Sequence, residues 1–329
     1  MEIRKVLVTF PVKKEYREKI ESIVPEAEYT YLAGYHPDDE QIKVQPEQLE
    51  DADVILGSVP PKMLKYCKKL KLFQLYSSGV NPYLGGIVPE GTLMASATGA
   101  YGLAISECML AGLLMLQKNM LPLMENQKKH LWKSIGMTKS VYGATVLCVG
   151  AGDIGCEFLK RCKALGAYTI GVRRVCDDKP DFMDELHMVD EIDELLPRAD
   201  VVALVLPQTK KTYHMFDEER LSKLRSDAIL INVGRGPTVD NMALCRLLEE
   251  GKIGGAVLDV TEPEPLPEEH PLWDAPNTII TPHVTGDFNL QQTVDNIAEI
   301  ACENFRRFCE GRPLINEVDF EEGYAKKNK

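Results

Sequence analysis

Apolar segments of strand length alternate along the chain with segments whose apolar residues recur at helical spacing. In the first hundred residues, the pattern predicts strands at residues 6–10, 54–56, 72–75 and 93–97, and helices at residues 13–24 and 61–69. Such alternation is typical of parallel sheets that are covered by helices. The chain is therefore predicted to have an α/β fold.

The pattern changes at residues 102–120, where nearly uncharged residues have helical spacing. A helix that is apolar on most faces must be covered on most faces, so we expect this helix to be buried between domains or at a dimer interface. Further strands are predicted at residues 168–172, 201–206, 228–233, 255–260 and 278–280. A last helix at residues 289–310 runs to Gly311-Arg312-Pro313, a stop signal, and is expected to return the chain to the first domain.

A glycine-rich segment follows the apolar residues 146–149, and residues 156–165 after it have helical spacing. In the pattern Gly-x-Gly-x-x-Gly, the first glycine permits a tight turn, the second lets the backbone approach a pyrophosphate, and the third lets helix and strand pack closely. The helix N-terminus also favours phosphates through its free N–H groups. The sequence therefore predicts dinucleotide binding by Gly150, Gly152, Asp153, Ile154 and Gly155.

The next strand ends at Arg173 and Arg174, where NAD-binding units carry an acidic residue for the adenosine ribose. A carboxylate repels a ribose 2′-phosphate, whereas two guanidinium groups attract it. The alternative is that both are solvated arginines at a strand end. We predict NADP as the preferred cofactor, with NAD possible.

Composition limits the remaining function classes. The 329 residues are 44% hydrophobic and 27% charged, which is ordinary for a globular protein with two domains, and the net charge is −12. That charge argues against nucleic acid and anionic membranes as partners, and no apolar run has the length of a membrane span. The nine cysteines include no CxxC pair and the first ten residues no signal-peptide pattern. We expect a cytoplasmic protein with reduced thiols and no metal site.

Polar residues follow three of the predicted strands in the second half of the chain. Arg235 follows residues 228–233, Glu264 comes after residues 255–260, and His283 follows residues 278–280. Each has an ordinary structural explanation: a surface turn, a solvated loop and a structural histidine. Because ligands lie beyond the carboxyl ends of the strands in an open parallel sheet, their joint occurrence favours a shared crevice with the glycine loop.

Four further motifs extend along the chain, and they are Ser78-Gly79-Val80, Ser106-Glu107, Leu206-Pro207-Gln208-Thr209 and His270-Pro271-Leu272-Trp273. With the segments above, they make nearly the whole chain resemble the D-isomer-specific 2-hydroxyacid dehydrogenases, of the glyoxylate/hydroxypyruvate reductase and phosphoglycerate dehydrogenase kind. The chain departs from that family in having Asn81 where Asp is common and Cys108 where His is frequent.

The resemblance implies two doubly wound parallel-sheet domains. A Rossmann dinucleotide-binding domain, residues 102–287, would be inserted in a flavodoxin-like substrate-binding domain, residues 1–101 plus 288–329. It also implies a homodimer. Trp132 then either reaches a substrate pocket across the dimer interface or simply packs.

The resemblance also assigns roles to residues. The catalytic set is Arg235, Glu264 and His283. Backbone amides at Ser78 and Gly79 bind the substrate carboxylate, and Arg235 and His283 also contact the substrate. Asp259 holds the nicotinamide carboxamide. The other cofactor-binding positions of the second domain are Leu206, Pro207, Thr212, Val233, Gly234, Arg235, His283 and Gly286.

The chemistry suits these residue types. Hydride transfer to a 2-keto carbon leaves an alkoxide that needs a proton, which His283 can supply near neutral pH. Glu264 would orient the ring and stabilise the imidazolium, and Arg235 would grip the substrate carboxylate. We expect an NADP-dependent reductase of a small 2-keto acid. The alternatives are a nicotinamide-sensing, corepressor-like binding protein, and a dehydrogenase of formate or phosphite, although formate enzymes have Gln in place of Glu264.

Overall fold

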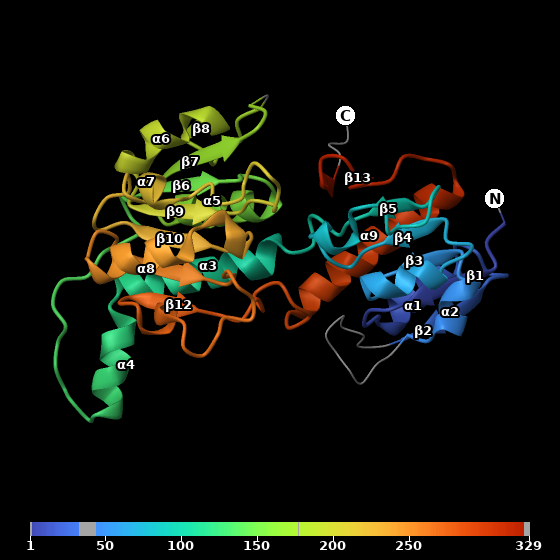
Figure 1. Cartoon of the computed structure of the whole chain (residues 1–329), viewed down its shortest axis with the longest axis horizontal. Helices are drawn as coiled ribbons and strands as arrows, with labels where there is room; N and C mark the ends of the chain where they lie inside the picture. Colours follow the sequence, from blue (N-terminus) through green and yellow to red (C-terminus); the bar gives the residue numbers. More distant parts are fainter. Residues whose placement is uncertain (1, 33–43, 177, 326–329) are drawn as a thin grey trace. The chain divides into compact units, whose positions relative to one another are not determined.

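The computed structural model describes residues 2–32, 44–176 and 178–325 (Figure 1). It divides the chain into two compact units, each built on a parallel sheet: unit 1 comprises Met1–Tyr101 and Phe288–Lys329, and unit 2 comprises Gly102–Asp287. The predicted α/β class with two parallel sheets is confirmed.

Unit 1 has a five-stranded parallel sheet in the order β2-β1-β3-β4-β5, which is the flavodoxin-like order. The strands are β1 (Lys5–Val8), β2 (Glu28–Tyr31), β3 (Val54–Leu56), β4 (Leu72–Gln74) and β5 (Leu93–Ala95). The sequence pattern did not predict β2, because this edge strand has no fully buried residue and reads as Glu-Tyr-Thr-Tyr.

Helices α1 (Lys14–Glu21), α2 (Pro46–Glu50) and α9 (Gln291–Cys309) accompany this sheet. Predicted helix 61–69 is instead the short 3₁₀ segment Pro61–Tyr66, which begins with proline at its first position. Helix α9 comes from the far end of the sequence and packs on α1 and β4. Its buried Asn304 donates to Gln74 Oε1 of β4 at 2.6 Å, so a polar contact fixes the helix on the sheet.

Unit 2 has a seven-stranded parallel sheet in the order β12-β11-β10-β9-β6-β7-β8, with the chain reversing direction across the sheet between β6 and β9. This is the doubly wound order of a Rossmann domain, with one further strand at an edge. The strands are β6 (Thr145–Val149), β7 (Tyr168–Arg173), β8 (Glu185–Met188), β9 (Val201–Leu204), β10 (Ile229–Asn232), β11 (Gly255–Leu258) and β12 (Thr278–Ile280). The polar edge strand β8 was not predicted.

The helices of unit 2 are α3 (Gly102–Gln117), α4 (Met120–Lys128), α5 (Asp153–Ala164), α6 (Ile192–Leu195), α7 (Glu218–Leu221) and α8 (Asn241–Glu249). The apolar helix expected at residues 102–120 ends earlier, because Asn119 takes a left-handed conformation with φ of 53°. Helix α3 packs on α5, β10 and β11 of its own unit. At Gly112 an added Cβ would lie 2.6 Å from a methyl of Val257, so the absence of a side chain permits this close packing.

The segment from α4 to residue 140 is the least covered part of unit 2. Helix α4 has no buried residue, every residue from 127 to 140 is exposed, and Figure 1 shows the helix projecting from the unit. Trp132 and Met137 are 106% and 95% exposed. We call residues 120–140 the arm. Because the Trp132 side chain is fully exposed, the prediction that it simply packs is wrong for packing within unit 2.

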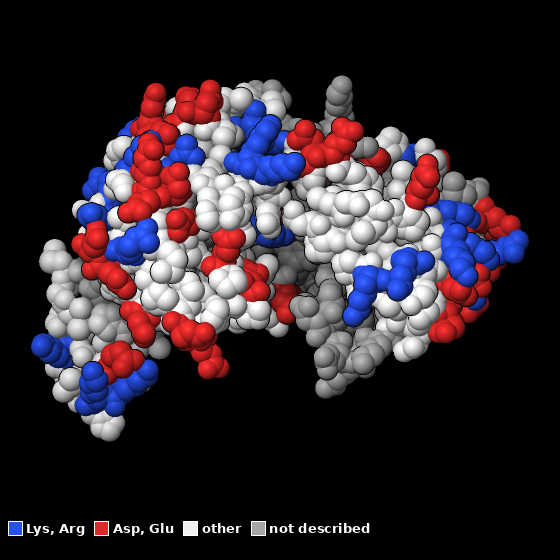
Figure 2. Space-filling view, in the orientation of Figure 1, with Lys and Arg blue, Asp and Glu red and all other residues white. Residues whose placement is uncertain are grey.

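No helix in the described residues is both long and apolar enough to cross a bilayer. On the face shown in Figure 2, Lys and Arg side chains are interspersed with Asp and Glu, rather than forming the continuous basic stripe that nucleic-acid binding favours. The cytoplasmic location stays a prediction.

Candidate active site

The glycine loop leads from β6 into α5, and two of its glycines are required by packing. Gly150 has φ of +97°, and an added Cβ would lie 2.2 Å from the carbonyl oxygen of Val205. A Cβ at Gly155 would lie 2.6 Å from the carbonyl oxygen of Gly150 and 2.8 Å from Cys148 Sγ. By contrast, a Cβ at Gly152 would meet nothing within 4 Å. This open side, at the N-terminus of α5, fits the pyrophosphate of a dinucleotide.

Arg173, at the end of β7, is tied to this loop. Its Nε donates a hydrogen bond to the carbonyl oxygen of Ala151 at 2.6 Å, and its Nη2 donates to Cys156 Sγ at 3.1 Å. Arg174 is exposed. The two arginines therefore differ: Arg173 is fixed against the glycine loop, whereas Arg174 presents its charge at the surface.

Asp153 occupies the first turn of α5, and burial, followed by the neighbouring Glu157, raises the pKa of its carboxyl group. The Gly102 N–H at the start of α3 donates to this carboxyl group. Asp153 therefore joins the glycine loop to the first residue of unit 2. Ile154, the next residue, is partly buried.

The loops after β9, β10 and β11 pack backbone against backbone. A Cβ at Gly234 would lie 2.6 Å from the Leu206 nitrogen, and one at Gly236 would lie 1.7 Å from the Thr261 carbonyl oxygen. The two glycines on either side of Arg235 therefore allow these loops to touch. Arg235, Glu264 and His283 follow the carboxyl ends of β10, β11 and β12, where a parallel sheet binds its ligands.

The loop after β9 is also closed by its own side chains. Thr212 Oγ1 donates to the carbonyl oxygen of Pro207 at 2.7 Å and accepts from the Thr209 N–H at 2.9 Å. Thr212 therefore shapes the Leu206-Pro207 segment from within. Val233 is buried at the end of β10, and Gly286 is partly buried in the loop after β12.

The carboxylate of Asp259 organises the loop that carries His283. It accepts hydrogen bonds from Thr281 Oγ1 and Thr285 Oγ1, each at 2.6 Å, and from the Val284 N–H at 3.1 Å. Its carbonyl oxygen accepts from the His283 N–H at 2.9 Å. Sequence reasoning did not assign Thr281 and Thr285 to the site. The signal that could have found them is the pair of hydroxyl residues on either side of His283, in the loop next to the strand end that carries Asp259.

His283 and Glu264 form a hydrogen-bonded pair. His283 Nδ1 lies 3.0 Å from Glu264 Oε2, and Glu264 Oε1 accepts from the Thr261 N–H at 3.0 Å. The hydrogen bond to Glu264 raises the pKa of His283 above its ordinary value, although burial opposes it. Burial raises the pKa of Glu264, but the hydrogen bond and charge of His283 outweigh it, so the net effect lowers this pKa.

Arg235 completes the group. Its Nη1 donates to the carbonyl oxygen of Gly234 at 2.6 Å, and among the residues that the structure describes its guanidinium makes no ion pair. Burial lowers the pKa of Arg235, while the charge of Glu264 opposes that change. The charge of Arg235 in turn lowers the pKa of both His283 and Glu264. Three residues distant in sequence are thus close enough to act on one another.

Ser78 and Gly79 lie in unit 1, in the loop after β4. Ser78 is exposed, and the loop is shaped by Ser77, whose Oγ donates to the Gly79 carbonyl oxygen at 2.8 Å. The Ala97 N–H donates to the Ser77 carbonyl oxygen at 2.9 Å, which ties the loop to the end of β5.

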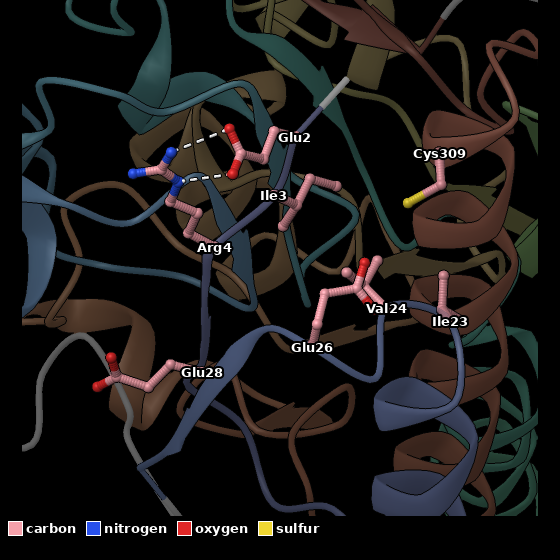
Figure 3. Close-up of a pocket in the computed structure, with 8 residues that line it drawn as sticks. All are labelled: Glu2, Ile3, Arg4, Ile23, Val24, Glu26, Glu28 and Cys309. Carbon is pink, nitrogen blue, oxygen red and sulfur yellow. Dashed lines mark hydrogen bonds and ion pairs between the residues drawn. The ribbon is translucent and has the colours of Figure 1, made fainter.

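A surface hollow in unit 1 contains none of the predicted site residues (Figure 3). It is lined by Glu2, Arg4, Glu26 and Glu28, together with apolar residues and Cys309. Arg4 Nε and Nη2 donate hydrogen bonds to the two carboxylate oxygens of Glu2, each at 3.0 Å. This hollow lies where β1 begins, and its arginine, Arg4, is already paired with Glu2.

Residues 110–285 match the family model described as "D-isomer specific 2-hydroxyacid dehydrogenase, NAD binding domain". A glyoxylate reductase of Korarchaeum cryptofilum is 37% identical over 202 residues, which cover 60% of this chain and 59% of that protein. Because the match spans less than two thirds of that relative, its substrate is not by itself the substrate of this chain.

Two solved structures match the chain almost completely. A D-isomer specific 2-hydroxyacid dehydrogenase family protein of Aeromonas salmonicida subsp. salmonicida A449 has a TM-score of 0.82 at 30% identity, covering 97% of this chain and 100% of that one. The NADPH-dependent glyoxylate/hydroxypyruvate reductase of Sinorhizobium meliloti, in complex with NADP and sulfate, has a TM-score of 0.80 at 25% identity, covering 98% and 100%. The chain therefore belongs to the D-isomer-specific 2-hydroxyacid dehydrogenase family, whose members are NAD(P)-dependent oxidoreductases.

Proposed function

We propose that the protein reduces a small 2-keto acid of the glyoxylate or hydroxypyruvate type to the D-2-hydroxy acid, with NADP(H) preferred over NAD(H). The observation that carries the proposal is the His283–Glu264 pair together with the partly buried guanidinium of Arg235. Reduction of an anionic keto acid requires a proton donor and a cation that is available to the substrate; His283 has a raised pKa, and Arg235 has no carboxylate partner within the described part of the chain.

In this mechanism His283 is the general acid. A bound nicotinamide supplies the hydride, and the oxygen of the former carbonyl gains negative charge that His283 neutralises with its proton. Glu264 holds the ring through Nδ1 and stabilises the imidazolium before transfer. In the oxidative direction, neutral His283 accepts the proton from the hydroxyl group.

Arg235 binds and orients the substrate. Its guanidinium can hold a carboxylate with two parallel hydrogen bonds and donate to the keto oxygen, which reduces the orientational freedom of the reacting carbonyl. In the same proposal the backbone N–H groups of Ser78 and Gly79 bind the substrate carboxylate. These donors, the Arg235 guanidinium and two backbone N–H groups, all bind the carboxylate or the keto group, so they suit a substrate with few other atoms.

The cofactor would lie along the carboxyl ends of the strands of unit 2. Gly150, Gly152, Asp153, Ile154 and Gly155 would surround the pyrophosphate, because Gly152 leaves the approach open. The ribose 2′-phosphate would be bound by Arg173 and Arg174, with Arg173 already fixed beside the loop. Asp259 would face the carboxamide, and the other contacts would come from Leu206, Pro207, Thr212, Val233, Gly234 and Gly286. That the S. meliloti protein binds NADP supports the preference.

A second copy of this chain is the proposed partner. The arm exposes Met120, Met124, Leu131, Trp132 and Met137, each at least 41% exposed. Exposed apolar residues concentrated on one projecting segment mark an interface. A homodimer formed through the arm would cover them. In that dimer, Trp132 would be covered by the partner subunit.

A panel of 2-keto acids, assayed by loss of NADPH and then NADH absorbance, tests the proposal. We expect turnover of small 2-keto acids and a higher kcat/KM with NADPH. Comparable kcat/KM for the two cofactors would contradict the cofactor preference. Cofactor binding without turnover of any acid would favour the corepressor-like alternative, and oxidation of formate or phosphite alone would favour the third. The glutamate at position 264 favours a keto-acid reductase over a formate enzyme.

A further inference from the structure

A second histidine–carboxylate pair shares the loop after β11 with the first. His214 Nε2 is 2.7 Å from Glu262 Oε2, and both side chains are about one-third exposed. His214 belongs to the loop between β9 and α7, whereas Glu262 lies two residues before Glu264 in the loop after β11. The pair therefore links two loops that are separated by 48 residues in the sequence.

The backbone holds His214 in place independently of this pair. Its ring stacks on Tyr213, with centroids 4.2 Å apart and planes at 9°, and its N–H donates to the carbonyl oxygen of Pro237 at 2.7 Å. The residue has φ of +45°, a left-handed conformation that non-glycine residues adopt only where the surroundings impose it. His214 is thus a fixed point that stands close to the loop carrying Arg235.

Glu262 is fixed from the opposite side of its loop. Its carbonyl oxygen accepts from Nδ2 of the buried Asn241 at 3.0 Å. Thr261 adds two contacts, because its Oγ1 donates to the Pro263 carbonyl oxygen at 2.9 Å and its N–H donates to Glu264 Oε1 at 3.0 Å. Each of residues 261–264 therefore takes part in a hydrogen bond. His214 adds the one that holds the Glu262 side chain.

We propose that His214 is a positioning residue, which, through Glu262, fixes the segment that holds the Glu264 carboxylate against His283. The inference rests on the proposed function, in which Glu264 orients the catalytic imidazole. A partly exposed hydrogen-bonded pair of this kind ordinarily contributes little to stability. This one differs because it lies two residues from a carboxylate whose orientation matters, and small displacements of reacting groups cost large factors in rate.

The chain contains a matched control. His187, on the edge strand β8, pairs with Glu191 at 2.7 Å and with Glu185 at 2.6 Å. This histidine is also partly exposed and bound to carboxylates in unit 2, but none of its partners adjoins the Arg235, Glu264 and His283 group. A general effect of losing a surface histidine–glutamate pair would appear equally in both places.

Steady-state kinetics of the full chain give the first test, with His214→Ala, His214→Gln and His187→Ala. We expect His214→Ala to lower kcat by roughly 10- to 100-fold with an unchanged Kd for NADPH. His214→Gln should recover most of the activity, because its side-chain amide still donates to Glu262. His187→Ala should match the wild type. An unchanged kcat in His214→Ala, an equal loss in His187→Ala, or no recovery in His214→Gln would each overturn the proposal.

A titration of His283 followed by NMR gives a second test that needs no turnover. The resonance is assigned by its loss in His283→Asn. If Glu264 is displaced in His214→Ala, it raises the pKa of His283 less, so the imidazole should titrate at lower pH than in the wild type. An identical titration curve would overturn the role of His214. The proposed function would fail separately, if the wild type reduced none of the 2-keto acids while this shift was observed.

Discussion

His283 Nδ1 lies 3.0 Å from Glu264 Oε2, and the other oxygen of that carboxylate is held by the backbone N–H of Thr261. With both oxygens engaged, Glu264 cannot rotate without losing a hydrogen bond. A carboxylate that accepts at Nδ1 keeps the proton of that nitrogen in place, so the proton to be transferred is the one on Nε2.

Replacing His283 with Ala should abolish reduction while leaving NADPH binding nearly unchanged. The imidazole is the proposed proton donor, and general acid catalysis contributes about 10²- to 10⁴-fold in rate. About half of the His283 side chain is exposed, so the fold should tolerate the change. Stopped-flow turnover and fluorescence titration with NADPH measure the two quantities. Retained activity in His283→Ala would remove this residue from the mechanism.

Reduction should depend on the raised pKa of His283. The protonated ring is the active form, so kcat/KM for the keto acid should be constant at low pH and fall as the pH rises through this pKa. Oxidation requires the neutral ring and should rise through the same pKa. In Glu264→Gln the hydrogen bond to a carboxylate that raises the pKa of His283 is lost, so the fall in kcat/KM should occur at lower pH. A fall in kcat/KM at the wild-type pH in Glu264→Gln would contradict the role of Glu264 in raising the pKa of His283.

Arg235→Lys should raise the KM for the keto acid and lower kcat, despite conserving the charge. Lysine offers a single ammonium group in place of the planar fork, and it cannot hold a carboxylate with two parallel hydrogen bonds. Loss of charged hydrogen bonds of this kind costs about 1.5–3 kcal/mol each, or roughly 10- to 100-fold in kcat/KM. The Kd for NADPH serves as the control and should change little. Wild-type kinetics in Arg235→Lys would show that the guanidinium does not bind the substrate.

Much of the architecture was predictable because buried parallel strands are continuous apolar runs. The glycine spacing identified β6 and α5, and the order of the polar loops identified where their side chains gather. Edge strands β2 and β8 were not predicted, because neither has a buried residue and so neither is a continuous apolar run. The break at Asn119 also escaped, because a left-handed residue inside an apolar, helix-favouring run leaves no mark in the spacing.

The candidate site was predictable in its residue types but not in its supports. Arg235, Glu264 and His283 stand at strand ends, where periodicity and topology place ligand-binding groups. The residues that hold them are polar side chains in loops, such as Thr281, Thr285 and His214. Their hydrogen bonds join loops distant in the sequence, and no spacing along one element reveals such contacts. The same limit applies to Asp259, because the contacts of its carboxylate with the loop of His283 join two loops.

The arm should mediate dimerisation. Replacing Trp132 and Met137 with Lys places two charges on a surface that is apolar and uncovered in the single chain, so the variant should be monomeric. Analytical ultracentrifugation across a concentration series measures this. Met188→Lys, which changes an exposed methionine on β8, is the matched control and should sediment as the wild type does. A monomeric wild type, or a dimeric Trp132→Lys/Met137→Lys variant, would contradict the prediction.

Alanine at two glycines of the same loop should have opposite consequences. Gly150→Ala forces a side chain into a backbone at φ of +97° and to within 2.2 Å of the Val205 carbonyl oxygen, so it should lower the Tm. Adopting this conformation alone costs about 1–2 kcal/mol for an L-residue, and the steric contact adds to it. Gly152→Ala meets nothing within 4 Å and should leave the Tm nearly unchanged.

The same Gly152→Ala variant should nevertheless bind NADPH weakly, because the added methyl group occupies the side from which the pyrophosphate would approach. Calorimetric unfolding and NADPH titration of both variants separate the two effects. Unimpaired binding in Gly152→Ala would show that the cofactor does not pass over this residue. If Gly150→Ala retained the wild-type Tm, the turn between β6 and α5 would have to accommodate a side chain by moving away from Val205, and the close contact between these neighbouring loops would not be a requirement of the fold.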